Sequence, residues 1–504
     1  MFYRTAHDDG ARPSGGPMRQ VVVGGSVAAL VAADRLSSQG VEVDLFLGDR
    51  PGGGFAPIAA SGRPVELGCR LIELSYDQAP AKTSAAVGSG DFDLSAGSGA
   101  SGSATDASFA ATPPLSEYQP GPHGHRPYVH LVDGLIRELL GDRLVEIEHP
   151  LMDIGSRWVR DWILSGDLTG LADAAGPKCD RFVMDALSGV GRWGERGWFE
   201  PEHRARLETQ SLREASESTL GAEFNNAFLE PVASRVLERG TADVVAALHR
   251  KIWLPLFWPG TVAASLSGVV PHVPNRPFHS VSRGGMGALV TVLLERLAQS
   301  DSVRIFRSGA LQRAQSQAGM TRCEFADGRA IEAQQPILGV AATELFAAAN
   351  VHIRLEMATT SLVWVEMEEG STPPDVLWTA GADRPVYRWS RSYASDGAPI
   401  MCGELAWWVR EQDLAETAVA DMQRSGIIDN PESVTVLGAI RRPSFAVPSL
   451  LNMNRFAVAR QELDARSLQA TLIGGIGAFG ADTCNEQIVQ GLAAAESVME
   501  RASL

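Results

Sequence analysis

Residues 19–54 read RQVVVGGSVAALVAADRLSSQGVEVDLFLGDRPGGG. The apolar run over residues 20–24 predicts a buried strand, and Val27, Leu30 and Val31 then lie on one face of a predicted helix. Gly40 stands where such a helix usually ends. The alternation in VEVDLFL has the period of a second strand. Strand, tight turn, helix and strand in this order predict a βαβ unit.

The turn between the first strand and the helix has the spacing Gly24-x-Ser26-x-x-Ala29, a variant of Gly-x-Gly-x-x-Gly. The first glycine permits a tight turn, and a small second residue lets backbone N–H groups approach a pyrophosphate. A small third residue lets the helix pack closely on the strand, and the helix N-terminus favours an anion. The turn predicts a dinucleotide site, although turns that bind nothing can carry the same small residues.

Three further stretches extend the pattern: GRPVELGCRLIEL at 62–74, VSRGGMGALVTVLLERL at 281–297 and RPSFAVPSLLNMNRFAVARQELDARSLQATLIGG at 442–475. Together with residues 19–54, they resemble the FAD-dependent amine oxidase, protoporphyrinogen oxidase and phytoene desaturase superfamily. The resemblance covers the chain from residue 19 to its end, except for a low-complexity insertion and a poorly matching helical region.

The resemblance implies an α/β fold. A Rossmann-like FAD-binding domain, with helices on a parallel sheet, is interwoven with a substrate domain that has a mixed sheet and a helical cap. We expect the FAD-binding domain to be formed by three separate segments, residues 18–78, 279–345 and 465–504. Between them we expect a low-complexity insertion (79–127), a mostly helical cap (128–278) and the substrate-domain sheet (346–464).

Two acids that the resemblance leads us to expect are absent. In the superfamily the second strand runs to an acid that holds the adenosine ribose, and Leu47 occupies that position here. The final turn usually reads Gly-Asp, whereas this chain has Gly474 and Gly475. A charge-assisted hydrogen bond to a hydroxyl contributes about 1.5–3 kcal/mol, so both losses weaken the expected FAD affinity. Asp49, two residues beyond Leu47, is the candidate substitute.

The resemblance assigns the FAD contacts mainly to small residues at the turns and helix starts. The expected cofactor-binding residues are Gly24, Gly25, Ser26, Ala29, Asp49, Gly53, Gly54, Ala310, Gly474, Gly475 and Asn485. Arg70 follows the ELG stretch and could pair with an anionic substrate or the reduced flavin, or else form a structural ion pair. Trp389 and Trp408 are candidates for a substrate-cavity wall, with core packing as the alternative. No catalytic residue and no metal site is predicted.

Composition excludes several classes of protein. The net charge is −16 and no long run of Lys or Arg occurs, which argues against a nucleic-acid partner. The five cysteines are scattered without a CxxC pair, so neither a disulfide framework nor a zinc site is expected, and a cytoplasmic location fits. No run of about 18 apolar residues occurs, so no transmembrane segment is predicted.

The sequence leaves two functions open. The first is a flavoprotein oxidoreductase of the amine oxidase or desaturase type, which uses FAD to oxidise a C–N or C–C bond of a small organic molecule. The second is a non-redox protein on the same fold, either a mutase, isomerase or cyclase or a flavin-free binding scaffold. The substrate, the electron acceptor and the oligomeric state do not follow from the sequence.

Overall fold

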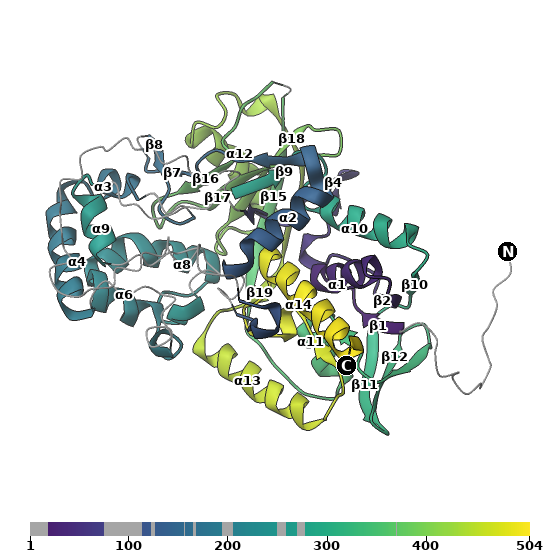
Figure 1. Cartoon of the computed structure of the whole chain (residues 1–504). Helices are drawn as coiled ribbons and strands as arrows, with labels where there is room; N and C mark the ends of the chain where they lie inside the picture. Colours follow the sequence, from purple (N-terminus) through teal and green to yellow (C-terminus); the bar gives the residue numbers. More distant parts are fainter. Residues whose placement is uncertain are drawn as a thin grey trace, which may run out of the picture.

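The computed structural model describes residues 19–74, 113–121, 126–155, 157–164, 168–193, 205–248, 259–269, 278–368 and 370–503. Most of the predicted insertion at 79–127 lies outside these residues. Three regions are arranged side by side: a parallel sheet with its helices, a large mixed sheet, and a group of helices at the far end (Figure 1).

Five strands form the sheet around which residues 19–54 fold. In order across the sheet they are β10 (Val303–Arg307), β2 (Glu42–Leu47), β1 (Arg19–Val23), β14 (Ile337–Leu338) and β20 (Thr471–Leu472). All neighbouring pairs are parallel, which confirms the predicted Rossmann-like sheet. The helix that follows β1 is α1 (Val27–Ser38), so the predicted βαβ unit is confirmed as well.

Alternate side chains of these strands enter two different cores, because successive residues of a strand point to opposite faces. Val22 and Leu45 pack with the helices α1, α10 (Gly287–Gln299) and α14 (Cys484–Ser503). Val23 and Phe46 point to the other face. That face is covered by β11 (Leu311–Gln317), β12 (Met320–Phe325), β13 (Ala330–Ala333), α11 (Ala342–Ala348) and α13 (Leu450–Ala465).

The large mixed sheet has seven strands. In order they are β19 (Val434–Ala446), β15 (Met357–Met367), β18 (Pro399–Leu405), β17 (Val386–Tyr393), β16 (Val376–Thr379), β7 (Leu151–Asp153) and β8 (Trp158–Arg160). Every neighbouring pair is antiparallel except β16 and β7. Helix α12 (Leu414–Arg424) covers one face, where Leu414 and Met422 pack against Trp389.

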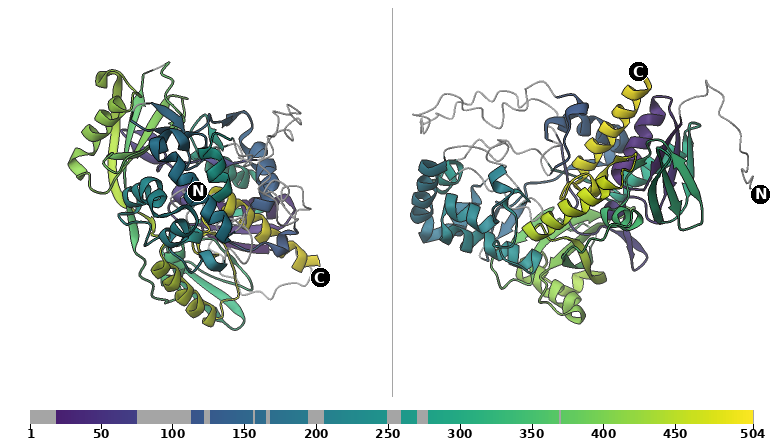
Figure 2. Two further views of the ribbon diagram at one scale, coloured as in Figure 1. Left: turned by 90° about the vertical axis from the view of Figure 1, so that its left-hand side faces the viewer. Right: turned by 90° about the horizontal axis from the view of Figure 1, so that it is seen from below.

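The helical cap lies against the other face of the large sheet. Its helices are α3 (Gly170–Ala175), α4 (Cys179–Trp193), α6 (Leu212–Leu220), α7 (Ala222–Phe224), the π-helix η7 (Asn225–Leu229), α8 (Glu230–Leu237) and α9 (Pro259–Leu266). Phe182 and Phe228 of the cap share a core with Trp378 and Tyr387 of the sheet. The cap and the parallel sheet are at opposite ends of the molecule (Figure 2).

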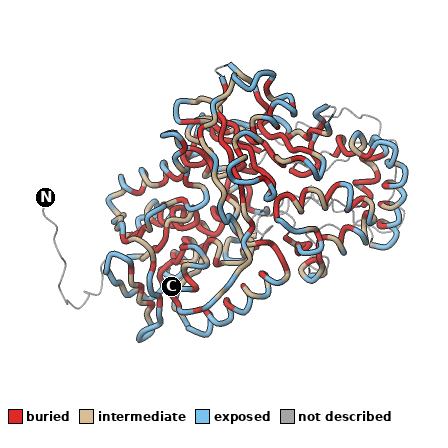
Figure 3. The backbone as a smooth tube through the Cα atoms, turned by 180° about the vertical axis from the view of Figure 1, so that it is seen from behind, coloured by how far each residue is buried: buried red, intermediate tan, exposed pale blue. Residues whose placement is uncertain are grey.

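Three segments within residues 128–278 lie outside this cap: α2 (Val129–Leu140), β6 (Leu144–Glu146) and the pair β7–β8. Helix α2 packs against α10 and α14 beside the parallel sheet, and β7 and β8 extend the large sheet. The remaining strands are the hairpin β3 (Ile58–Ala60) and β4 (Arg63–Val65), and the small sheet of β5 (Ile72–Glu73), β9 (Phe278–Val281) and β6. Buried residues follow the strands of both sheets, whereas the outer turns of the cap are exposed (Figure 3).

Candidate cofactor and substrate site

The glycine turns from opposite ends of the chain meet at the carboxyl edge of the parallel sheet. Strands β1 and β20 flank β14 on its two sides. A Cβ atom on Gly474 would lie 3.6 Å from Ser26 Oγ, and one on Gly339 would lie 2.9 Å from the same atom. The β1–α1 turn, the end of β14 and the β20–α14 turn therefore form one continuous surface.

The conformation of the first turn requires glycine at its first position. Gly24 has a φ of +112°, and a Cβ there would lie 2.4 Å from the Gly339 carbonyl oxygen. Its N–H donates to the Phe46 carbonyl at 2.8 Å, which ties the turn to β2. The small first residue of the motif thus permits β1 and β14 to approach each other closely.

The N-terminus of α1 lies at this surface, and no acidic side chain accompanies it. Ser26 is the N-cap, and its Oγ accepts a hydrogen bond from Ala29 N at 3.2 Å. The first turn of α1 contains no acidic residue. Since the first four N–H groups of a helix lack intrahelical partners, the cap satisfies one and leaves the others to hold an anion.

The turn after β2 packs directly on the first turn. Gly52 N donates to the Gly25 carbonyl at 2.6 Å, and a Cβ on Gly25 would lie 2.8 Å from the Cα of Pro51. In contrast, a Cβ on Gly53 or Gly475 would have no atom within 4 Å. Space is therefore open beside both of these predicted FAD-contacting glycines.

Leu47 and Asp49 have opposite surroundings. Leu47 is 1% exposed and belongs to the core beneath α1 and α10. Asp49 is exposed, and a Cβ on Gly309 would lie 3.8 Å from its Oδ1 atom. Asp49 thus lies beside the β10–β11 loop that contains Ala310, whose carbonyl oxygen accepts a hydrogen bond from Ala326 N at 2.9 Å.

The start of α14 is held by bonds within the protein. Asn485 Nδ2 donates to the Glu73 carbonyl at 2.6 Å, so the amide nitrogen of this predicted FAD contact has a structural partner. Glu486 accepts hydrogen bonds from Tyr118 Oη and from Gly121 N. Gly474 N donates to Gln490 Oε1 at 2.8 Å. These bonds fix the last turn against β5 and residues 113–121.

Arg70 lies next to the turn after β2 and has no carboxylate partner in the described ranges of the chain. Its guanidinium is 5.4 Å from the centre of the Phe55 ring, and its buried Nε atom has no hydrogen-bond acceptor. A Cβ on Gly54 would lie 3.7 Å from Arg70 Nη2. Among the described residues Arg70 thus forms no ion pair within 4 Å, although its charge acts on the nearby Glu66.

A buried polar cluster, consisting of Cys69, Tyr387, Arg388 and Glu404, joins the ELG stretch to the large sheet. Glu404 accepts hydrogen bonds from Cys69 N at 3.0 Å, Tyr387 Oη at 3.1 Å and Arg388 Nε at 2.8 Å. Burial lowers the pKa of Arg388, but the contacting Glu404 carboxylate outweighs this effect and raises it overall. Sequence reasoning missed this cluster; charged residues on otherwise apolar strands were the only signal.

Glu66, in the same stretch, is a buried acid that the fold holds close to the start of α10. Its Oε1 accepts a hydrogen bond from Met286 N at 2.6 Å. Burial raises its pKa from about 4.5 to about 7, while that hydrogen bond and the charge of Arg70 oppose the shift. Between these two pH values the folded protein keeps Glu66 protonated, whereas the unfolded chain ionises it.

The free energy of unfolding should therefore fall as the pH rises from about 4.5 through 7. Between pH 5 and pH 8, we expect the free energy of unfolding in urea to fall by about 3 kcal/mol more in the wild type than in Glu66→Gln, which cannot ionise. An identical pH dependence in the two proteins would contradict this assignment.

The two predicted tryptophans do not line the surface where the turns meet. Trp389 is fully buried between β17 and α12, and its Nε1 donates to Asp421 Oδ2 at 3.0 Å. This position corrects the prediction, because the ring faces away from the cap side of the sheet. Trp408 is 39% exposed and packs edge-to-face on Trp407, with ring centres 5.9 Å apart.

Comparison with known proteins supports this geometry. Residues 22–83 match the family described as NAD(P)-binding Rossmann-like domain. No curated protein matches the sequence. A reduced UDP-galactopyranose mutase is similar in structure, with a TM-score of 0.64 at 15% identity over 97% of this chain and 95% of that chain.

Two other solved structures are similar over nearly their whole length. The fatty acid isomerase from P. acnes that produces CLA has a TM-score of 0.54 at 13% identity, covering 96% of this chain and 98% of that chain. Putrescine oxidase bound to putrescine has a TM-score of 0.54 at 14% identity, covering 96% of this chain and 100% of that chain.

The chain thus shares the fold of these solved structures, among them a mutase and putrescine oxidase, which confirms the predicted resemblance and fold class. In the described ranges, no helix is long and apolar enough to cross a membrane. The same ranges contain no cluster of three or more His, Cys, Asp or Glu residues arranged for a metal ion.

Proposed function

We propose that the protein binds FAD where the glycine-containing turns after β1, β2 and β20 meet. With this cofactor it would oxidise a C–N or C–C bond of a small organic molecule. The observation that carries this proposal is the close approach of two turns more than 400 residues apart: Ser26 at the N-terminus of α1 and Gly474 just after β20. Helix N-termini and glycine backbones are the elements that hold a pyrophosphate.

The described residues fit an extended dinucleotide. Residues 24–26 and the α1 N-terminus would hold the pyrophosphate, and Asp49 would reach the adenosine side in place of Leu47. Gly53 and Gly475 leave open space along the expected path. Bound FAD would supply the redox chemistry, while the protein supplies binding, orientation and electrostatics.

Where the flavin ring is expected, the protein supplies the positive charge of Arg70 beside the buried pair of Arg388 and Glu404. Arg70 has no acidic partner among the described residues, so it would favour an anionic ring or an anionic substrate. The Glu404 carboxylate and the Arg388 guanidinium neutralise each other, and Glu404 also accepts a hydrogen bond from Cys69 N. They position the ELG stretch and exclude water from its inner side.

A titration of the purified protein with FAD tests the proposal. We expect one FAD per chain and an absorbance band near about 450 nm. A colourless preparation that binds no added FAD would refute it and leave the flavin-free scaffold. Protein that binds FAD but is not reduced by any amine or desaturation substrate under anaerobic conditions would instead indicate the mutase or isomerase alternative.

Restoring an acid in the last turn should tighten FAD binding. Gly475→Asp places a carboxylate where a Cβ meets no atom within 4 Å, so the fold can accommodate it. A charge-assisted bond to a cofactor hydroxyl should increase affinity about tenfold or more. The neutral isostere Gly475→Asn is the control, and equal affinities for the two variants would show that the cofactor hydroxyls lie elsewhere.

A further inference from the structure

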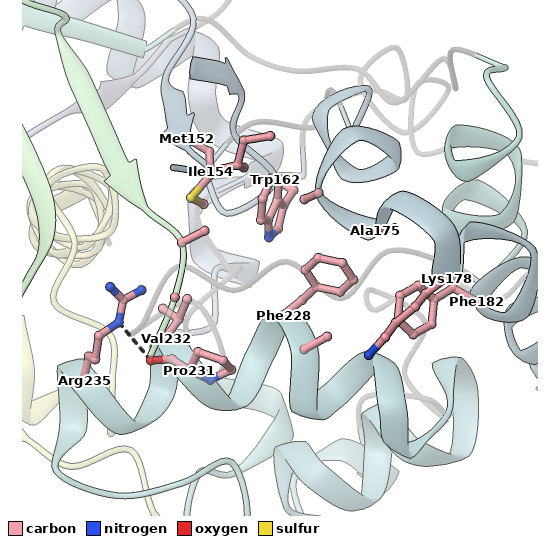
Figure 4. A pocket seen from close by; sticks show the side chains of 14 residues that line it. Met152, Ile154, Trp162, Ala175, Lys178, Phe182, Phe228, Pro231, Val232 and Arg235 are labelled. Atoms are coloured by element: carbon pink, nitrogen blue, oxygen red, sulfur yellow. Dashed lines mark hydrogen bonds between the residues drawn. The ribbon is translucent and has the colours of Figure 1, made fainter. Parts of the chain in front are cut away.

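A separate cavity of about 260 Å³ lies in the cap, between its helices and the edge of the large sheet (Figure 4). Helices α3, α4 and α8 and the π-helix η7 form one side, while Met152 of β7 and Ala380 after β16 form the other. Ligand sites in proteins usually occupy about 300–1,000 Å³, so this volume suits a small ligand.

Three aromatic side chains stand among the mostly apolar residues that line the cavity. Phe228 is central, with the Trp162 ring edge-to-face against it at 5.6 Å and the Phe182 ring at 5.6 Å on another side. All three side chains are at least nine-tenths buried. Aromatic rings in this arrangement bind a flat or branched apolar body through its buried surface area.

One strong hydrogen-bond donor on this wall has no acceptor. Trp162 is 5% exposed, and its Nε1 atom is buried without a hydrogen-bond partner in the described structure. Figure 4 shows this nitrogen directed toward Phe228, into the cavity. A buried N–H without an acceptor costs about 1–3 kcal/mol, so a ligand that supplies an acceptor here would remove that cost.

The charged groups at the cavity are cationic. Arg235 is 1% exposed and donates to three neutral acceptors, namely the Pro231 carbonyl at 3.0 Å, Thr379 Oγ1 at 2.9 Å and the Thr379 carbonyl at 2.6 Å. Lys178 lies at the rim, where it pairs with Glu223 at 3.0 Å. No Asp or Glu lines the cavity within the described residues.

The nearest buried carboxylates are already engaged. Asp153 and Asp421 both bind Arg384, at 2.8 and 2.9 Å, rather than Arg235. Burial and the neighbouring Arg384 lower the pKa of Arg235 to about 10, against the opposing charges of Asp421 and Asp383, so it stays charged at neutral pH.

We infer that this cavity binds a small carboxylate with an aromatic or branched apolar body and rejects the corresponding amine. The three aromatic side chains and their apolar neighbours would hold the apolar body, and the carboxylate would accept from Trp162 Nε1 in the field of Arg235. The inference concerns ligand binding in the cap alone, so it does not depend on FAD.

Phenylacetate and phenethylamine, titrated by calorimetry into the purified full-length protein, test this inference. We expect phenylacetate to bind with a Kd below about 1 mM and the amine to bind at least about tenfold more weakly. Equal binding of the two probes, or binding of neither at concentrations up to about 10 mM, would overturn it.

Two variants locate the binding. Trp162→Phe keeps the ring but removes the donor, and should weaken phenylacetate about tenfold. Ala175→Leu fills the cavity from α3 and should abolish binding. Trp158→Phe is the matched control, because Trp158 Nε1 donates to the Ser425 carbonyl at 2.8 Å and does not line the cavity. Full affinity in Trp162→Phe would overturn the inference even if Ala175→Leu failed to fold.

Discussion

Replacing Ser26 with aspartate should weaken FAD binding at least about a hundredfold while the protein stays folded. The reason is that Ser26 caps α1 at the point where the pyrophosphate is expected. Aspartate is as good an N-cap as serine, so α1 keeps its stability. Its carboxylate would repel a pyrophosphate about 5 Å away by about 3 kcal/mol at an effective dielectric constant of about 20.

The matched control for this charge effect is Ser26→Asn, which also caps the helix but carries no charge. We expect the asparagine variant to bind FAD within a few-fold of the wild type. Thermal unfolding of the three apoproteins, measured beside the FAD titrations, separates loss of binding from loss of fold. Unchanged FAD affinity in Ser26→Asp would place the pyrophosphate away from α1.

The second large effect is expected at Arg384. The Arg384 side chain is 4% exposed. It forms ion pairs with two carboxylates that are also buried, Asp153 and Asp421. Arg384→Ala would leave both acids buried without their cation. Breaking a buried ion pair from one side typically costs about 3–5 kcal/mol, so the free energy of unfolding in urea should fall by that amount.

Neutralising the two acids should restore much of the lost stability. The triple variant Arg384→Met with Asp153→Asn and Asp421→Asn removes the uncompensated charges and keeps an apolar side chain of similar length. As a control, Arg410→Ala breaks an exposed pair with Asp413 and should change the stability by less than about 1 kcal/mol. If Arg384→Ala also lowered the free energy of unfolding by less than about 1 kcal/mol, the buried carboxylates must have found other partners.

The sequence predicts the parallel sheet and its first helix well because their signals are local. The alternation in β2, the helical spacing in α1 and the small residues of the turn all lie within residues 19–54. The meeting of the first and last turns followed from the resemblance rather than from any local pattern. It is a contact between Ser26 and Gly474 that only the order of strands β1, β14 and β20 brings about.

The side chains that surround the candidate site could not be predicted in the same way. Arg388 and Glu404 pair across neighbouring strands, and Arg384 reaches Asp153, which is 231 residues away in the chain. Such pairs depend on strand register, which a single sequence does not reveal. Trp389 and Trp408 both stand in stretches rich in aromatic residues, but Trp389 lies within β17 and is buried, whereas Trp408 lies in the turn after β18 and is exposed.

The position of β20 and α14 at the end of the chain has a consequence for biosynthesis. About 420 residues separate the turn after β2 from Gly475. At about 5–20 residues per second, the ribosome needs roughly 20–80 s to span them. Strand β14 is made about 130 residues before β20, so for roughly 7–27 s of that interval the edge of β14 that later pairs with β20 has no strand beside it. A nascent chain therefore passes through a stage with an open sheet edge, when chaperone protection matters most, and any dinucleotide that needs the last turn can load only after β20 has been made.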